Sequence, residues 1–109
     1  MTNLEVRLLR LLKVGKENAI PTSELASLLK IDIRTIRNLV RSLRLKHGIA
    51  IIGGRETGAK GLYIPANDTE RLEGIRALEN QANEERKTIT ALLNADLGEF
   101  RRALDGSIE

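Results

Sequence analysis

Cysteine is missing from the 109 residues, and histidine and aromatic residues are scarce. Without a thiol the chain can form neither a disulfide nor a thiolate metal site. Its one histidine, His47, has no evident partner in the sequence for a catalytic dyad or a metal centre. The two aromatic residues, Tyr63 and Phe100, are too few to stack the bases of single-stranded DNA or RNA. We therefore expect no enzyme, no metal site and no cofactor, and duplex DNA is the better candidate among nucleic acids.

Long apolar runs are missing as well. No segment approaches the roughly 20 apolar residues that span a membrane. The leucine-rich residues 8–12 are interrupted by Arg10 and lack the features of a secretory signal. A hydrophobic content of 41% with 30% charged residues is typical of a globular protein. We expect a cytoplasmic chain without membrane contact, made of a compact domain over residues 1–66 and a helical region over residues 67–109.

Positive charge is concentrated in the middle of the chain. Residues 30–60 contain eight Lys and Arg against two Asp and Glu, a net charge of +6. Residues 61–109 contain six basic and ten acidic residues, a net charge of −4. A basic segment beside an acidic remainder is the electrostatic pattern expected of a polyanion-binding protein.

Residues 33–44 are expected to form a helix with one apolar and one polar face. Asp32 precedes this segment and can cap it, because its carboxylate accepts hydrogen bonds from the first free backbone N–H groups. The apolar face consists of Ile36, Leu39, Val40 and Leu43. The polar face consists of Arg34, Asn38 and Arg41. Arginine can pair with phosphate or guanine and asparagine with adenine, which favours DNA contact, although an ordinary solvated helix face has the same pattern.

Two shorter helices are expected before this one. The first is capped by Asn3, has an apolar face of leucines and stops near Gly15. A brief extended segment over residues 19–21 follows. The second helix is capped by Thr22 and ends near Lys30. Its apolar stripe consists of Leu25, Ala26, Leu28 and Leu29. Two short helices joined by about three residues, the second with an outward polar face, form a helix-turn-helix arrangement.

After Arg44 the apolar spacing becomes typical of strands, over residues 49–52 and 62–64. The intervening residues 53–61 include four glycines, so they are expected to form the tip of a hairpin. Arg55 and Lys60 can extend from this tip toward phosphate. The glycine spacing is close to that of a P-loop, but Ala59 stands where that motif needs lysine and no helix follows. An ordinary hairpin without a ligand remains an alternative.

The last third of the chain predicts a long helix that starts at a capping box of Asn67 and Glu70 and runs to about Leu93. Apolar residues follow a seven-residue repeat along it, with Glu85 interrupting one core position, and this pattern favours a seam between two copies. The predicted dimerisation residues are Leu72, Ile75, Leu78, Ala82, Ile89 and Leu92. Alternatively, the helix folds back on its own domain. A short final helix over residues 96–104 is expected to turn Leu97, Phe100 and Leu104 inward, against the long helix.

The order of helix, short strand, helix, polar-faced helix and basic hairpin resembles winged helix-turn-helix domains. The resemblance covers about residues 4–65 and lies in Arg34-Thr35-Ile36-Arg37 of the polar-faced helix and in Lys60-Gly61-Leu62-Tyr63 of the hairpin. These stretches look like the DNA-binding half of biotin-ligase repressors and sugar-metabolism repressors. No ligase or sugar-sensing region follows in this sequence, in which respect it is similar to small prophage-borne winged-helix proteins.

The resemblance implies a mainly α fold with a small β-hairpin wing, followed here by the long C-terminal helix. In that family the recognition helix, residues 33–44 here, enters the major groove. The wing, residues 53–61, contacts the flanking backbone or the minor groove. The DNA contacts implied are Arg34, Thr35, Asn38 and Arg41, with Arg37 at the edge of that surface, and Arg55 and Lys60 in the wing.

We therefore expect a sequence-specific regulator of transcription that binds double-stranded DNA, acts as a repressor and forms a homodimer. One alternative is an architectural or phage or plasmid replication accessory protein with little sequence preference. A second is a winged-helix module that binds an unidentified protein partner. Selection of bound DNA from a random pool separates the first two, and the absence of DNA binding at low salt indicates the third.

Overall fold

The computed structural model describes residues 1–53 and 61–108, and the chain divides into two compact units, Met1–Glu79 and Asn80–Glu109. The first unit contains helices, a small antiparallel hairpin and the beginning of the long helix α4 (Asp68–Asn94). The second contains the rest of α4 and a final helix, α5 (Glu99–Ile108). None of the helices in the described part of the chain is long and apolar enough to cross a membrane.

Helix α1 (Asn3–Leu11) begins at a complete capping box. The Thr2 hydroxyl accepts a hydrogen bond from the Glu5 N–H (3.1 Å), and Glu5 Oε1 accepts one from the Thr2 N–H (2.8 Å). The cap is therefore Thr2 and not Asn3 as predicted, because only Thr2 has a glutamate at the reciprocal third helical position. The helix ends at Leu11, with Leu12 as its extended C-cap, and Gly15 (φ 101°) precedes a short 3-10 helix, η1 (Lys16–Asn18).

Helices α2 (Thr22–Leu29) and α3 (Ile33–His47) are separated by three residues. Pro21 occupies the cap position of α2 and Thr22 is already helical, so the prediction that Thr22 is the cap is wrong. Lys30 adopts a left-handed conformation (φ 56°, ψ 44°), which reverses the chain sharply before the next helix. Asp32 caps α3 as predicted, because its Oδ1 accepts the Thr35 N–H at 2.7 Å.

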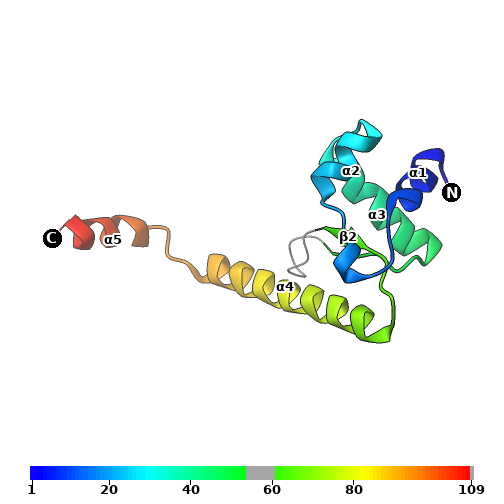
Figure 1. Cartoon of the computed structure of the whole chain (residues 1–109). Helices are drawn as coiled ribbons and strands as arrows, with labels where there is room; N and C mark the ends of the chain where they lie inside the picture. Colours follow the sequence, from blue (N-terminus) through cyan, green and yellow to red (C-terminus); the bar gives the residue numbers. More distant parts are fainter. Residues whose placement is uncertain (54–60, 109) are drawn as a thin grey trace. The chain divides into compact units, whose positions relative to one another are not determined.

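The three helices α1, α2 and α3 pack against one another in pairs around a single core (Figure 1). The predicted apolar face of α3 is confirmed, because Ile36, Val40 and Leu43 are buried and Leu39 packs on the core from its edge. The predicted stripe of α2 needs one correction. Leu28 is 54% exposed, since it lies on the outer side of the helix. The remaining core side chains of the helices are Leu8, Leu12, Leu25, Ala26 and Leu29.

The hairpin is shorter than predicted. Strands β1 (Ile52–Gly53) and β2 (Leu62–Tyr63) pair antiparallel, with Ile52 opposite Tyr63. Ile51 is buried in the helical core and does not extend the strand. The predicted extended segment before α2 is confirmed as a single bridge, in which Ile20 and Leu62 exchange both backbone hydrogen bonds (3.0 and 2.8 Å). The hairpin therefore lies directly against the start of α2.

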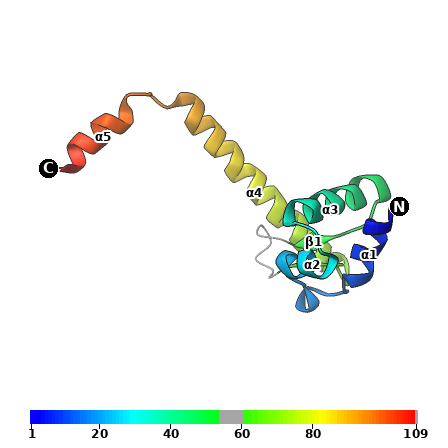
Figure 2. The same ribbon diagram turned by 90° about the horizontal axis from the view of Figure 1, so that it is seen from above.

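The start of α4 belongs to the first unit. The Glu70 N–H donates to Asn67 Oδ1 (3.0 Å), which is half of the predicted capping box. The Glu70 carboxylate accepts instead from the N–H groups of Ala66 (2.9 Å) and Lys16 (3.3 Å). Gly74 is buried, and a Cβ added there would lie 2.3 Å from Cγ2 of Ile52. The first turns of α4 therefore pack closely on β1, and Figure 2 shows these two elements together.

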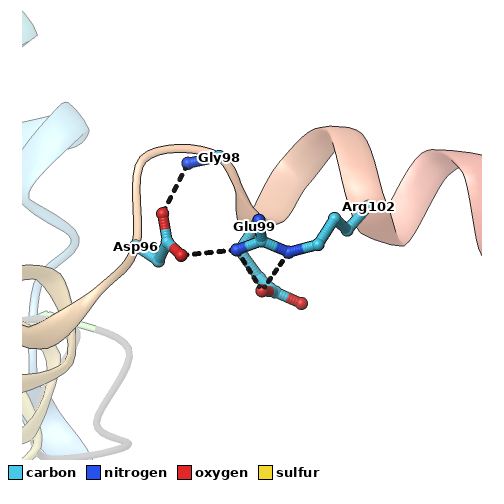
Figure 3. Close-up of polar contacts among 4 residues, drawn as sticks. All are labelled: Asp96, Gly98, Glu99 and Arg102. Carbon is cyan, nitrogen blue, oxygen red and sulfur yellow. Dashed lines mark hydrogen bonds and ion pairs between the residues drawn. The ribbon is translucent and has the colours of Figure 1, made fainter.

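In the second unit a polar cluster precedes and starts α5 (Figure 3). Asp96 Oδ1 accepts the Gly98 N–H at 2.8 Å, and the Arg102 guanidinium pairs with both Asp96 and Glu99. These hydrogen bonds form a turn, so the helix begins at Glu99 and not at Asp96 as predicted. The expected inward packing is also wrong. Exposed fractions are 93% for Leu97, 60% for Phe100 and 56% for Leu104.

Candidate nucleic-acid interface

The outer side of α3 carries four exposed polar side chains. They are Arg34, Arg37, Asn38 and Arg41, and we name them the basic face. At about 100° per residue they fall within an arc of about 100° around the helix axis and span two turns. The opposite side of the helix is buried in the core, so its rotation is set by packing and the basic face points away from the body of the unit.

Thr35, the fifth residue of α3 predicted to contact DNA, lies apart from the basic face. It is half-buried and about 100° around the axis from Arg34. Its backbone N–H is used by the Asp32 cap. Hydrogen bonding to Thr35, by its side chain and by its N–H, lowers the pKa of the Asp32 carboxyl. The cap therefore stays charged at neutral pH, and the end of α3 that carries Arg34 has a firmly positioned first turn.

The other end of α3 is held by a buried carboxylate that sequence reasoning missed. Glu5 of α1 is only 3% exposed, and its Oε2 accepts a 2.9 Å hydrogen bond from Ser42 Oγ and lies 3.4 Å from Nε2 of His47. Hydrogen bonds from the Thr2 backbone and side chain, and then from Ser42, lower the pKa of Glu5 to about 2. The only signal in the sequence is the capping box of Thr2 and Glu5. It predicts that the Glu5 carboxylate accepts a hydrogen bond from the Thr2 N–H, but not that α3 covers the carboxylate.

Arg44 belongs to the basic segment but not to the basic face. It is half-buried, and its Nε donates a 2.8 Å hydrogen bond to the carbonyl oxygen of Ile51. This bond joins α3 to the segment that enters the hairpin. The position of the hairpin relative to α3 is therefore stabilised by Arg44. From the sequence, this residue was counted only as part of the net positive charge of residues 30–60.

Two exposed apolar side chains of α3 were also missed. Ile33, in the first turn, is 40% exposed, and Leu45, near the end, is 71% exposed. A helical projection places Ile33 about 40° from Arg37 and Leu45 between Arg34 and Asn38. The projection alone could have found Leu45, which lies among the polar residues, but not Ile33, which it places only about 20° from the buried Val40.

The tip of the hairpin falls on residues 54–60, so the predicted contacts Arg55 and Lys60 lie outside the described residues. The residues on each side of the tip are glycines with specific requirements. Gly53 has φ 123°, a conformation that side chains disfavour. A Cβ on Gly61 would lie 1.9 Å from the Ile20 carbonyl oxygen. The close packing of the described part of the hairpin therefore requires glycine at positions 53 and 61.

The predicted dimerisation residues are distributed over both units. In the first unit Leu72 and Ile75 are 51% and 40% exposed, and Leu78 is half-buried. In the second unit Ala82, Ile89 and Leu92 are all exposed. Gly74 is the residue of α4 that is buried. Large apolar side chains are thus solvent-accessible at heptad positions in each unit of this single chain.

The basic face offers guanidinium groups for phosphate or guanine and a carboxamide that can donate and accept hydrogen bonds at an adenine edge. Among the residues that the structure describes, no group of three or more histidine, aspartate or glutamate residues could hold a metal ion. The basic face is therefore the part of the described chain whose chemistry most clearly suits a ligand. Comparison of the chain with protein-family models, with curated proteins and with solved structures finds no match in any of the three.

Proposed function

We propose that this protein is a sequence-specific regulator of transcription that binds duplex DNA and acts as a repressor. In this proposal α2 and α3 form a helix-turn-helix and the β1–β2 hairpin with its tip is the wing. One observation carries the proposal: Arg34, Arg37, Asn38 and Arg41 share the exposed side of a helix whose other side is anchored in the core. A major groove accommodates a helix of this kind, and base edges there present distinct donor and acceptor patterns.

The direction of approach follows from the helix-turn-helix arrangement, in which the N-terminal residues of the second helix contact base edges. Arg34 and Asn38 lie in the first two turns of α3. We assign Arg34 to guanine, by a bidentate pair, and Asn38 to adenine. Arg37 and Arg41, on the side of the arc away from Asn38, are assigned to phosphates. The wing residues Arg55 and Lys60 are proposed to contact the flanking backbone or minor groove.

Duplex DNA is favoured over single strands because the first unit, which carries the basic face, has no exposed aromatic side chain among its described residues. Tyr63 is 1% exposed and lies in the hairpin, so its ring cannot stack on a base. Phe100 belongs to α5 in the second unit. Proteins that bind single strands rely on such rings, whereas contacts to a duplex need the cationic and amide groups that α3 supplies.

Dimerisation is proposed to occur through the heptad residues of α4. Exposed apolar side chains at this spacing are stabilised when a second copy covers them, since burial removes each from water. A two-fold dimer presents two basic faces related by the same axis. It should therefore prefer inverted half-sites.

The test is selection of bound sequences from a random duplex pool, followed by affinity measurements across salt concentrations. The wild-type protein should enrich an inverted repeat, and the double variant Arg34→Ala, Arg41→Ala should enrich nothing. Arg76→Ala, Arg86→Ala is the matched control, because it removes two exposed arginines of α4 and the same charge. The control should still enrich the repeat.

Two other results would contradict the proposal. Binding that depends on salt alone, with no enriched sequence, would indicate an architectural or replication accessory protein. No DNA binding even at low salt would indicate a module that contacts another protein.

A further inference from the structure

Ile33 is a large apolar side chain exposed in the first turn of α3. It lies outside the core cluster and outside the ring of half-buried residues packed on that cluster. The packing expected at a helix start is already supplied by its neighbours, because Ile31 precedes the cap and Ile36 is fully buried four positions after it. Ile33 thus keeps 40% of its surface exposed at a helix start whose neighbouring apolar side chains, Ile31 and Ile36, lie in the core or pack against it.

The surroundings of Ile33 are those of a DNA contact. Arg34 follows it directly and Arg37 lies one turn further on, about 40° around the axis. Both arginines are exposed. As the first residue of α3, Ile33 is at the end that enters the groove in a helix-turn-helix protein. Ile33 thus lies at the edge of the basic face, between Arg37 and the buried Val40, at the end of α3 that is proposed to enter the groove.

We infer that Ile33 contacts the 5-methyl group of a thymine in the major groove, next to the base read by Arg34. This inference rests on the proposed function. Thymine is the one base that presents an apolar group in that groove, and apolar side chains discriminate by contact with it. The site recognised would thus combine a thymine with the guanine and adenine assigned to Arg34 and Asn38.

The experiment replaces each thymine of the selected site, one at a time, by deoxyuridine, which lacks only the methyl group. At one position per half-site, removal of the methyl group should lower the affinity of the wild-type protein about fourfold. This is the change expected when one methyl-sized group is no longer buried. Ile33→Ala should bind the thymine site more weakly and should not distinguish thymine from deoxyuridine at that position. Ile33→Val, which keeps a branched apolar contact, should retain most of the distinction.

Leu45→Ala is the matched control. Leu45 is, like Ile33, an exposed aliphatic side chain of α3, but it lies twelve residues later, about 18 Å along the helix axis. It should preserve the full effect of the methyl group at that position. Ile33 is on the surface, so circular dichroism should show that all three variants fold.

The inference is overturned if no thymine of an enriched site shows the methyl effect, or if Ile33→Ala keeps it, or if Leu45→Ala removes it. These results differ from failure of the proposed function, in which no sequence is enriched at all and the inference is lost with it. Loss of affinity for every sequence alike in Ile33→Ala would also overturn it, since this would indicate a general effect on the helix.

Discussion

Ser42 of α3 donates a 2.9 Å hydrogen bond from its Oγ to Oε2 of Glu5 in α1. The same oxygen lies 3.4 Å from Nε2 of His47, and the other carboxylate oxygen accepts the Thr2 N–H. One buried carboxylate therefore completes the cap of α1 and holds two positions of α3. The orientation of the proposed recognition helix depends on this contact as well as on apolar packing.

Glu5 should make stability depend on pH in the acid range. Its pKa is lowered from 4.5 to about 2 in the folded chain, so the unfolded chain binds the proton more tightly. The stabilisation is complete above about pH 4.5 and is lost as the pH falls toward 2. Glu5→Gln should lower the thermal midpoint at pH 7 and show a smaller further fall between these pH values. The measurement is thermal unfolding followed by circular dichroism.

Glu79→Gln is the control for Glu5, because it neutralises an exposed glutamate of α4. Its midpoint at pH 7 and its acid dependence should match the wild type. Equal behaviour of the two variants would contradict the role given to Glu5.

Gly74→Ala should destabilise the first unit, against the usual preference of helices for alanine. The added Cβ would lie 2.3 Å from Cγ2 of Ile52, which is buried and has little room to move. We expect a loss of about 1 to 3 kcal/mol in the free energy of unfolding by urea, as for other overpacked sites. The loss should be smaller when Ile52 is also changed to alanine.

Gly106→Ala is the matched control for Gly74, since no atom lies within 4 Å of a Cβ placed there. It should leave the urea midpoint unchanged and slightly increase helix content. A loss of stability in this variant comparable to that of Gly74→Ala would exclude the packing explanation.

Asn38→Ala and Lys60→Ala should weaken DNA binding in different ways. Asn38→Ala should cost about 1 to 3 kcal/mol on the selected site and relax the preference at one base position. Lys60→Ala should weaken selected and random DNA alike and reduce the salt dependence by about one unit. Both are measured by titration of labelled duplexes at several salt concentrations. Equal losses on both DNAs for Asn38→Ala would rule out its assignment to a base.

Leu92→Asp should shift the protein from dimer to monomer. The side chain is 72% exposed in the single chain, so its change should not disturb folding of the monomer. We expect the dimer to weaken tenfold or more, about 1.4 kcal/mol, as measured by analytical ultracentrifugation. Glu85→Leu, which places an apolar residue at the interrupted heptad position, should strengthen it.

Asn80→Asp is the control for Leu92→Asp, because it adds the same charge to α4 outside the heptad core. It should remain dimeric. A wild-type protein that sediments as a monomer at micromolar concentration would exclude the proposed seam altogether.

Local signals were sufficient to predict the start of α3 and its two faces, although the helix runs to His47 and not to Arg44 as predicted. A helix cap and an apolar period involve residues within one or two turns, so Asp32 and the face of Ile36, Val40 and Leu43 followed from their own neighbours. Thr2 and Asn3 were adjacent candidates for the cap of α1. The correct one, Thr2, is distinguished by its reciprocal partner Glu5, and the prediction chose Asn3 instead. The mainly helical architecture with one hairpin and a long helix in the C-terminal third was also predictable in this way.

Contacts between distant segments decided the rest. The Thr2–Glu5 capping box, which was not predicted, accounts only for the local hydrogen bonds of Glu5, whereas its burial required Ser42, 37 residues away, to lie over it. Likewise, position 74 requires glycine only because α4 packs so closely on Ile52 that a Cβ would not fit. Leu28 and Leu97 were predicted to be buried because they are apolar and lie at helical spacing. In the described part of the chain, however, no other element covers them enough to remove them from water. Periodicity predicts which side chains can share a face, whereas burial depends on which other elements reach that face in the folded chain.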